Sequence, residues 1–294
     1  MPTAYVVLLV SNLIFATGYS VSRLLLEEIS PVTLAMARLT IGSLILVPWA
    51  WRGMKAAKLS REDHWRLGLT GVVGFTLAFA LGNWGLAHST ASNAALLITV
   101  EPASLILLSP LLLGERLSRQ ESLGAALAIL GAAVIVVNGI PGITLALAPH
   151  WRGDLVLILS GVAYAAYSLI ARPVLLRHPA LVVTAYSVAW GAAAMLPFAL
   201  LEWATGPGPG WTARTIAGTL YLGVVMTALG YAVWNWCLER VETPRMAIFL
   251  NIQPLGGALL GVWWLGERLT VFTVVGGLAI LTGLHLTVKA GGRE

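Results

Sequence analysis

Apolar stretches long enough to cross a membrane follow one another along almost the whole of this 294-residue chain. A helix of about 20 apolar residues spans the roughly 30 Å hydrocarbon core of a bilayer. Charged residues make up only 11% of the sequence, less than half of the roughly 25% that is usual in soluble domains. The chain is therefore predicted to be an all-α polytopic membrane protein that crosses a membrane many times.

Ten such spans are expected, and they are numbered here in chain order. They lie at about 4–26, 31–51, 66–87, 92–113, 119–138, 152–172, 180–203, 214–238, 244–265 and 270–289. If both termini are cytoplasmic, thirteen of the 18 Lys and Arg residues fall in or beside cytoplasmic loops. Cytoplasmic loops of membrane proteins are enriched in Lys and Arg, so both termini are expected in the cytoplasm. The formal net charge of +5 then follows from topology and gives no reason to expect a nucleic-acid partner.

The second half of the sequence repeats the first. At an offset of 152 positions an Asn-Trp pair, a proline and a Leu-Gly-Glu-Arg-Leu pentapeptide recur: 83–84 with 235–236, 102 with 254, and 113–117 with 265–269. Spans 1 and 2 align with spans 6 and 7 at an offset of 149. The sequence therefore predicts one membrane domain made of two five-helix repeats, residues 1–140 and 150–290.

Five is an odd number of crossings, so the second repeat must enter the membrane in the opposite orientation. Inverted repeats of this kind recur in secondary transporters, whose substrate sites lie near the bilayer midplane between the repeats. Two inverted halves can exchange conformations, so that a gate at one end closes as the gate at the other end opens. The repeat thus predicts transport by alternating access.

The repeated pentapeptide has two interpretations. Its glycine, Gly114 or Gly266, suits the left-handed residue that ends a helix, and the Ser or Thr after it can cap the next helix. In this interpretation the pentapeptide is a tight turn between antiparallel neighbours. In the other, Glu115 or Glu267 has a role in gating.

These features together resemble a known family. Each half ends in a Pro-bearing helix, the pentapeptide and a helix with regularly spaced glycines. This pattern is similar to that of the drug/metabolite transporter superfamily, and specifically to its EamA-type exporters, which include the YddG-like amino-acid exporters. The resemblance implies a central cavity lined mainly by helices 1, 3, 4, 6, 8 and 9, with helices 5 and 10 in peripheral or packing positions.

Polar and aromatic side chains form stripes at helical spacing on several spans. Such stripes suit a cavity that holds organic solutes by apolar contact and orients them with a few hydrogen bonds. The same residue types also join membrane helices to one another, which is the alternative for each of them. The candidates for a substrate-binding cavity are Asn12, Phe15, Tyr19, Phe79, Asn83, Trp84, Glu101, Tyr164, Tyr167, Tyr231, Asn235, Trp236 and Gln253.

Glu101 is the most informative of these candidates. It lies within span 4, and its counterpart in the second repeat is the neutral Gln253. A charged carboxylate at the bilayer centre costs at least about 3 kcal/mol, so it must face protein or water. It either binds a proton or a substrate ammonium group, or it is fixed in an ion pair with Arg38 or protonated in a hydrogen-bond network. The neighbouring Pro102, and Pro254 in the second repeat, are candidate hinges or static kinks.

The favoured function is a secondary transporter of small organic metabolites. The family resemblance implies export, with amino acids, including aromatic and hydrophobic ones, as the first choice of substrate, and a location in the cell (inner) membrane. A multidrug or other metabolite exporter is the alternative within the class. A channel or an intramembrane enzyme is the alternative outside it, but no Gly-x-Ser-x-Gly or His-Glu-x-x-His motif occurs. No catalytic residue, metal site or cofactor is predicted, and the expected partners are a small-molecule substrate, the lipid bilayer and, in one alternative, protons. One chain can form the whole path, so a monomer is expected to function.

Overall fold

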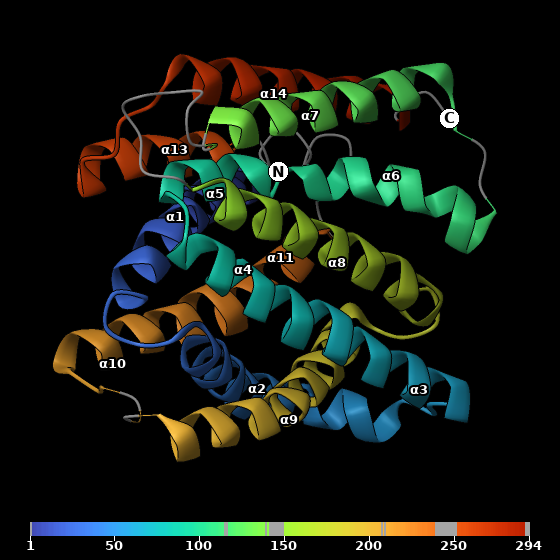
Figure 1. Ribbon diagram of the computed structural model, residues 1–294. Coiled ribbons are helices and arrows are strands. Elements are labelled where there is room, and N and C mark those ends of the chain that lie inside the picture. The colour runs from blue at the N-terminus through green and yellow to red at the C-terminus, as the bar shows by residue number, and fades with distance from the viewer. Residues whose placement is uncertain are drawn as a thin grey trace.

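Helices account for every regular element in the part of the chain that the structure describes (Figure 1). This computed structural model describes residues 2–114, 117–138, 140, 150–206, 208, 210–238 and 252–291. The elements are α1 (Pro2–Leu25), α2 (Pro31–Ala56), α3 (Arg61–Thr70), η1 (Gly71–Leu77), α4 (Ala78–Ala87), α5 (Ala91–Leu97), α6 (Val100–Leu113), α7 (Arg119–Asn138), α8 (Trp151–Leu175), α9 (Ala180–Thr205), α10 (Ala213–Leu220), η2 (Tyr221–Leu229), α11 (Gly230–Leu238), α13 (Ile252–Leu265) and α14 (Val271–Gly291).

The prediction of ten membrane helices is confirmed, with eight long apolar helices and two shorter ones, Ile252–Leu265 and Val271–Thr287. Span 3 consists of α3, η1 and α4, span 4 of α5 and α6, and span 8 of α10, η2 and α11. Span 3 begins at Arg61, earlier than the predicted 66, because Ser60 and Asp63 form a capping box that starts the helix. The predicted start of span 9 falls outside the described residues.

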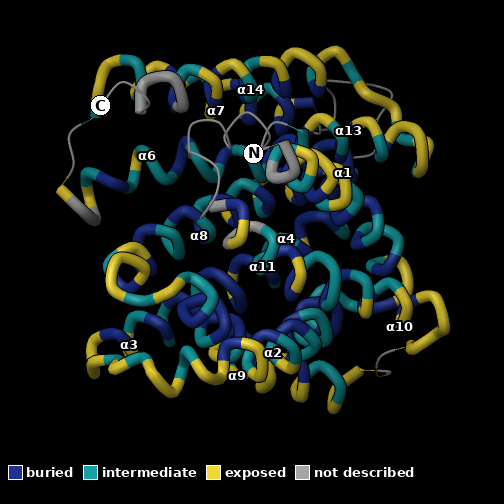
Figure 2. Tube along the Cα trace, turned by 180° about the vertical axis from the view of Figure 1, so that it is seen from behind, coloured by how far each residue is buried: buried dark blue, intermediate teal, exposed yellow. Residues whose placement is uncertain are grey.

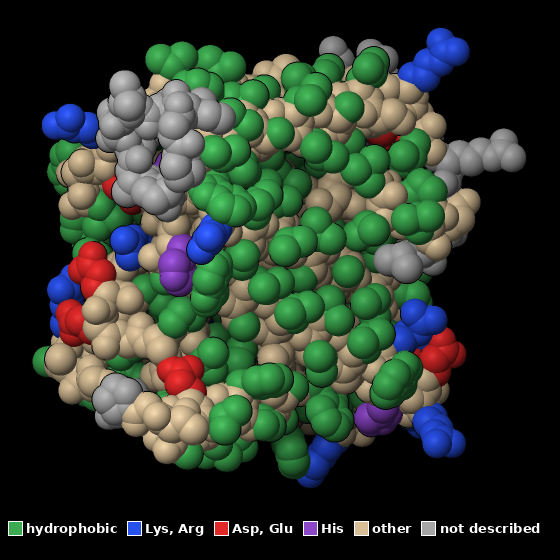
Figure 3. Space-filling model, in the orientation of Figure 1, with side chains coloured by type: hydrophobic (Ala, Val, Ile, Leu, Met, Phe, Trp, Pro, Cys, Tyr) green, Lys and Arg blue, Asp and Glu red, His purple; other side chains and the backbone are tan. Residues whose placement is uncertain are grey.

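The surface of the molecule is that of a protein surrounded by lipid. Figure 2 shows buried residues in the interior and exposed ones along the outward sides of the helices. Many of the exposed side chains are large and apolar, such as Trp263 at 84% and Leu111 at 79% exposed. Figure 3 shows apolar side chains over the middle of one face, with Lys, Arg, Asp and Glu gathered toward two opposite edges. This is the distribution expected when the middle band faces hydrocarbon and the edges face water.

The two ends of the helix bundle carry matching contacts across the repeats. Asp63, in the capping box of α3, accepts a hydrogen bond at 2.6 Å from Arg177, which lies in the loop between spans 6 and 7. At the other end, Arg214 in the first turn of α10 donates a hydrogen bond at 3.0 Å to Glu28, which lies in the loop between spans 1 and 2. Glu28 aligns with Arg177 at the offset of 149. The loop position is therefore equivalent in the two repeats and carries the opposite charge, whereas its helix partners differ, because Arg214 aligns with Glu62 and not with Asp63 at the offset of 152.

Spans 5 and 10, formed by α7 and α14, lie side by side at one edge of the molecule (Figure 1). Glycines allow their backbones to approach closely. A Cβ added at Gly131 would lie 2.5 Å from the Gly276 carbonyl oxygen, and one added at Gly124 would lie 2.7 Å from that of Gly283. At the offset of 152, Gly124 aligns with Gly276 and Gly131 with Gly283, so the two contacts are exchanged by the repeat. Small residues at such crossings are typical of membrane helices.

Gly131→Ala is expected to destabilise the protein by about 1–3 kcal/mol, the usual cost of overpacking. The added methyl group can be accommodated only if the two backbones separate. Thermal unfolding of the purified protein in detergent measures the effect. Gly68→Ala is the matched control, because nothing lies within 4 Å of a Cβ at that position. Equal melting temperatures for the two variants would contradict the close crossing.

Candidate functional site

A cavity of about 410 Å³ lies between the two repeats. Its wall is formed by residues of α1, α4, α6 and α8, of η2, α11 and α13, and by one residue of α2. Every helix that the family resemblance implies, namely 1, 3, 4, 6, 8 and 9, contributes to this wall. Small-molecule sites usually have volumes of roughly 300–1,000 Å³, so the cavity is large enough to hold a metabolite.

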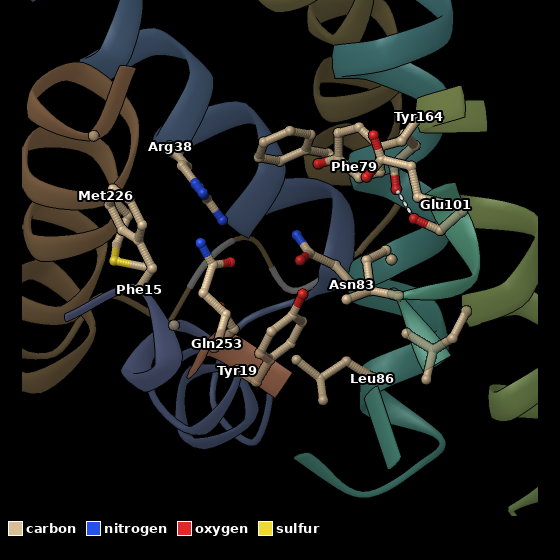
Figure 4. A pocket seen from close by; sticks show the side chains of 18 of the residues that line it. Phe15, Tyr19, Arg38, Phe79, Asn83, Leu86, Glu101, Tyr164, Met226 and Gln253 are labelled. Carbon is tan, nitrogen blue, oxygen red and sulfur yellow. Dashed lines mark hydrogen bonds between the residues drawn. The ribbon is translucent and has the colours of Figure 1, made fainter. Parts of the chain in front are cut away.

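The structure places eight of the thirteen candidate residues on the cavity wall, and Figure 4 shows most of them. They come from both repeats, which is what the stripes on the aligned helices require. These eight are Phe15, Tyr19, Phe79, Asn83, Glu101, Tyr164, Tyr231 and Gln253.

Two other candidates support the wall from behind. Asn12 is fully buried and accepts a hydrogen bond from Gln253 at 2.8 Å, which fixes the amide of that cavity residue. Tyr167 lies one helical turn beyond Tyr164, and its ring packs against Phe75 with 5.3 Å between the centroids. Both side chains therefore act on the cavity through a neighbour.

The two tryptophan candidates do not line the cavity. Trp84 is 39% exposed and stacks on His88, with 4.0 Å between the ring centroids. It follows Asn83, and successive side chains on a helix point about 100° apart, so Asn83 faces the cavity and Trp84 faces outward. Trp236 is likewise exposed, at 36%. The side chain of Asn235 lies outside the described part of the chain.

A cluster of aromatic rings lies at one end of the cavity. Phe75 is 1% exposed, and its centroid lies 5.9 Å from that of Phe79 and 6.0 Å from that of Tyr231. In the predicted orientation this cluster is on the cytoplasmic side. The wall residues of α1 run from Phe15 to Ser22, toward the C-terminal end of that helix, so in the same orientation the cavity occupies the external half of the protein.

Arg38 lies on the cavity wall although the sequence stripes did not include it. Its Nε donates a hydrogen bond to Thr227 Oγ1 at 2.9 Å, and its guanidinium carbon lies 4.7 Å from the centre of the Phe79 ring. The signal that could have identified it was its charge within an apolar span, because ionisable residues at such positions normally face a cavity or a partner.

Glu101 reaches the cavity because span 4 is broken. The turn at Ile98 and Thr99 separates α5 from α6. Pro102 has no N–H to donate to the Ile98 carbonyl group, which instead accepts from the Glu101 N–H at 3.0 Å. The predicted kink beside Pro102 is therefore present. Pro254 lies near the start of α13, and the preceding residues, 239–251, are outside the described part.

The expected alternative of a fixed Arg38–Glu101 ion pair is not found. Among the described residues, neither side chain forms a salt bridge with any other. Figure 4 shows Arg38 and Glu101 on opposite sides of the cavity. The cavity thus holds one cationic and one acidic side chain that do not neutralise each other directly.

Two π-helical segments lie at equivalent places in the repeats. They are η1 in span 3 and η2 in span 8, and Gly71 in the former aligns with Gly223 in the latter. The Thr227 hydroxyl bonds the Leu222 carbonyl oxygen five residues earlier at 3.1 Å, within η2. Segments of π-helix often occur at functional sites. The sequence analysis missed both, since the apolar pattern does not distinguish a π-turn from an α-turn.

The second pentapeptide joins the two repeats at the end of the molecule that is predicted to be external. Gly266 has the expected positive φ of 69°, and Gly114 has 70°. Glu267 accepts hydrogen bonds from the backbone N–H groups of Ala91 at 2.6 Å and Ser92 at 2.8 Å, and from the Ser92 hydroxyl at 2.6 Å. A carboxylate is favourable there, because α5 begins with unsatisfied N–H groups. Glu115 lies outside the described residues.

The fold and the cavity indicate the class of protein, a membrane transporter with two inverted five-helix repeats. The EamA-like transporter family matches the chain twice, over residues 2–137 and 151–289. The chain therefore belongs to the EamA-like transporter family, within the drug/metabolite transporter superfamily, and is a multi-pass membrane transporter and not an enzyme.

Relatives cover almost the whole chain. An uncharacterised transporter of Archaeoglobus fulgidus is 28% identical over 96% of both chains. A probable terminal-alkyne amino-acid exporter of Streptantibioticus cattleyicolor is 29% identical over 92% of this chain and 89% of the relative. A probable amino-acid metabolite efflux pump of Salmonella typhimurium is 27% identical over 75% of this chain and 77% of the relative. A crystal structure that is 18% identical superimposes with a TM-score of 0.66 over 100% of this chain and 99% of the other, which shows the shared fold.

Met226→Cys is expected to react at least ten times faster than Leu44→Cys with a small water-soluble methanethiosulfonate reagent. Met226 lines the cavity, whereas Leu44 is 70% exposed on the outward face of the middle of α2, where lipid is expected to exclude water. The native Cys237 is fully buried, so the unmodified protein provides the background rate, measured by mass spectrometry. Equal rates at the two positions would contradict this placement.

Glu267→Gln is expected to lower stability by about 2–3 kcal/mol, because hydrogen bonds to charged groups are worth roughly 1.5–3 kcal/mol. The variant keeps the shape of the side chain but loses the charge and one acceptor. Glu62→Gln is the control, since Glu62 is exposed and its one ion pair within the described part of the chain is with Arg66, one turn away. Thermal unfolding measures the melting temperatures of both variants. Equal small decreases in melting temperature would show that the Glu267 contacts contribute little to stability.

Proposed function

We propose that this protein exports amino acids, with aromatic and hydrophobic ones favoured, by alternating access through the central cavity. The observation that supports this most directly is the cavity itself. It lies between the inverted repeats, its wall is largely aromatic and aliphatic, and it carries only a few polar groups. Such a wall holds an apolar side chain by contact and orients the polar part of a solute by sparse hydrogen bonds.

The position of the cavity is consistent with one state of a transport cycle. The aromatic cluster around Phe75 closes it on the predicted cytoplasmic side, while its wall extends toward the external ends of α1 and α4. The opposite state requires the two repeats to exchange these arrangements. In that exchange the cluster opens and the external ends come together.

The alternatives differ in substrate or class. A multidrug or other metabolite exporter would use the same cavity, and two relatives whose names specify amino acids or their metabolites favour the first proposal. A sugar phosphate would call for several cationic groups, and Arg38 is the one Lys or Arg on the described wall. A channel would show flux that is neither saturable nor stimulated by substrate on the other side of the membrane.

Purified protein in proteoliposomes is expected to take up labelled phenylalanine saturably, and faster when unlabelled phenylalanine is inside. Gly18→Leu is expected to reduce this exchange at least tenfold, because a side chain at Gly18 would displace Met226 into the cavity. Trp84→Phe, on the outward face, is the control and is expected to stay within about twofold of the native rate.

The same assay with an imposed pH gradient distinguishes export driven by protons from export along the solute gradient. Exchange of a drug or another metabolite, with no amino-acid flux, would assign the protein to a different branch of its superfamily. Non-saturable flux without exchange would indicate a channel.

A further inference from the structure

The cavity contains two charged side chains that the fold holds apart. Arg38 projects from α2 and Glu101 from the start of α6, and Figure 4 shows them on opposite sides of the space. Charges within a membrane or a protein interior are costly unless they are paired. Here neither is paired with another charged side chain in the described part of the chain. A ligand that carries both charges would satisfy both groups at once.

The guanidinium group of Arg38 is held in a fixed orientation. Its Nε is occupied by Thr227, and one face of the group is covered by the Phe79 ring. The two Nη groups form no hydrogen bond with any described residue. An arginine in this setting presents the fork that matches the two oxygens of a carboxylate. Thr227 and Phe79 thus orient the fork, and the cavity side of Arg38 remains available.

Glu101 supplies the complementary end. An ionised carboxylate only accepts hydrogen bonds, and an ammonium group only donates them. Tyr19 and Tyr164 also line the cavity, and no described residue is hydrogen-bonded to either hydroxyl group. These hydroxyls can accept the ammonium protons that Glu101 does not take.

We propose that Arg38, positioned by Thr227 and Phe79, binds the carboxylate of a zwitterionic α-amino acid, while Glu101 binds its ammonium group. This inference rests on the proposed function and specifies the part of the substrate that the site recognises. The aromatic wall then contacts the variable side chain. Selection is for the zwitterion, so compounds with only one of its charges are poorer ligands than the amino acid.

Binding of three ligands to purified protein tests this assignment. They are phenylalanine, phenylalaninamide, which lacks the carboxylate, and 3-phenylpropanoate, which lacks the ammonium group. Native protein is expected to bind phenylalanine about 10- to 100-fold more tightly than either analogue, because each charged hydrogen bond contributes roughly that factor. Isothermal titration in detergent measures the three affinities.

The variants should separate the two ends of the ligand. Arg38→Gln is expected to weaken the binding of phenylalanine about 10- to 100-fold and to leave the affinity for phenylalaninamide unchanged. Glu101→Gln is expected to weaken the binding of phenylalanine by a similar factor and to leave the affinity for 3-phenylpropanoate unchanged. Arg38→Lys keeps the charge without the fork and should give an intermediate affinity for phenylalanine. Arg23→Gln, a change outside the cavity wall, is the control and should leave all three affinities as in the native protein.

The outcomes distinguish this inference from the proposed function. If Arg38→Gln weakens the binding of phenylalanine and of phenylalaninamide equally, with an unchanged melting temperature, Arg38 does not recognise the carboxylate. The inference then fails, while the proposal of amino-acid transport stands. If the native protein neither binds nor exchanges any amino acid, both fail. If Arg38→Gln does not fold, the result for Arg38→Lys decides: an affinity equal to that of native protein would overturn the role of the fork.

Discussion

An odd number of helices in each repeat is the constraint from which the rest of this structure follows. Because five crossings reverse the chain direction, a contact within one repeat can recur at the opposite end of the membrane. The reciprocal glycine contacts between α7 and α14 show this most clearly. The π-helical segments in spans 3 and 8 and the capping boxes that open α3 and α10 follow the same rule. A cavity at the interface of two such halves is the natural position for a site that must be reached from either side.

The repeats differ where charge enters the cavity. Glu101 aligns with the neutral Gln253, and Arg38 aligns with Ser187 at the offset of 149. Both cavity charges therefore belong to the first repeat. Ser187 lies in α9 and bonds Thr70 at 2.8 Å in a fully packed environment. The scaffold is thus nearly symmetric, whereas the charged groups that a solute meets come from the first repeat alone.

Much of this architecture could be predicted from the sequence, because it depends on pattern. Apolar length identified the ten helices, and the repeated glycine predicted the left-handed residues at Gly114 and Gly266. The helical stripes, together with Glu101 and its counterpart Gln253, predicted eight of the residues that line the cavity. The outward position of Trp84 could have been predicted too, since it follows directly after Asn83. The two π-helical segments could not be predicted, because an apolar pattern does not distinguish a π-turn from an α-turn. The contact of Glu267 with α5 joins segments far apart in the chain, and sequence alone gave no partner for it.

The Glu267 contact also indicates that the hydrogen bonds between the repeats differ at the two ends of the molecule. Its donors are the N–H groups of Ala91 and Ser92 and the Ser92 hydroxyl. The residue that aligns with Ser92 is Pro244, which has neither an amide N–H nor a hydroxyl group. The position aligned with Ser92 thus lacks two of the three donors that Glu267 uses. A cycle in which the halves exchange places would therefore run between states of unequal free energy, and the resting population would be set by this inequality as well as by the solute.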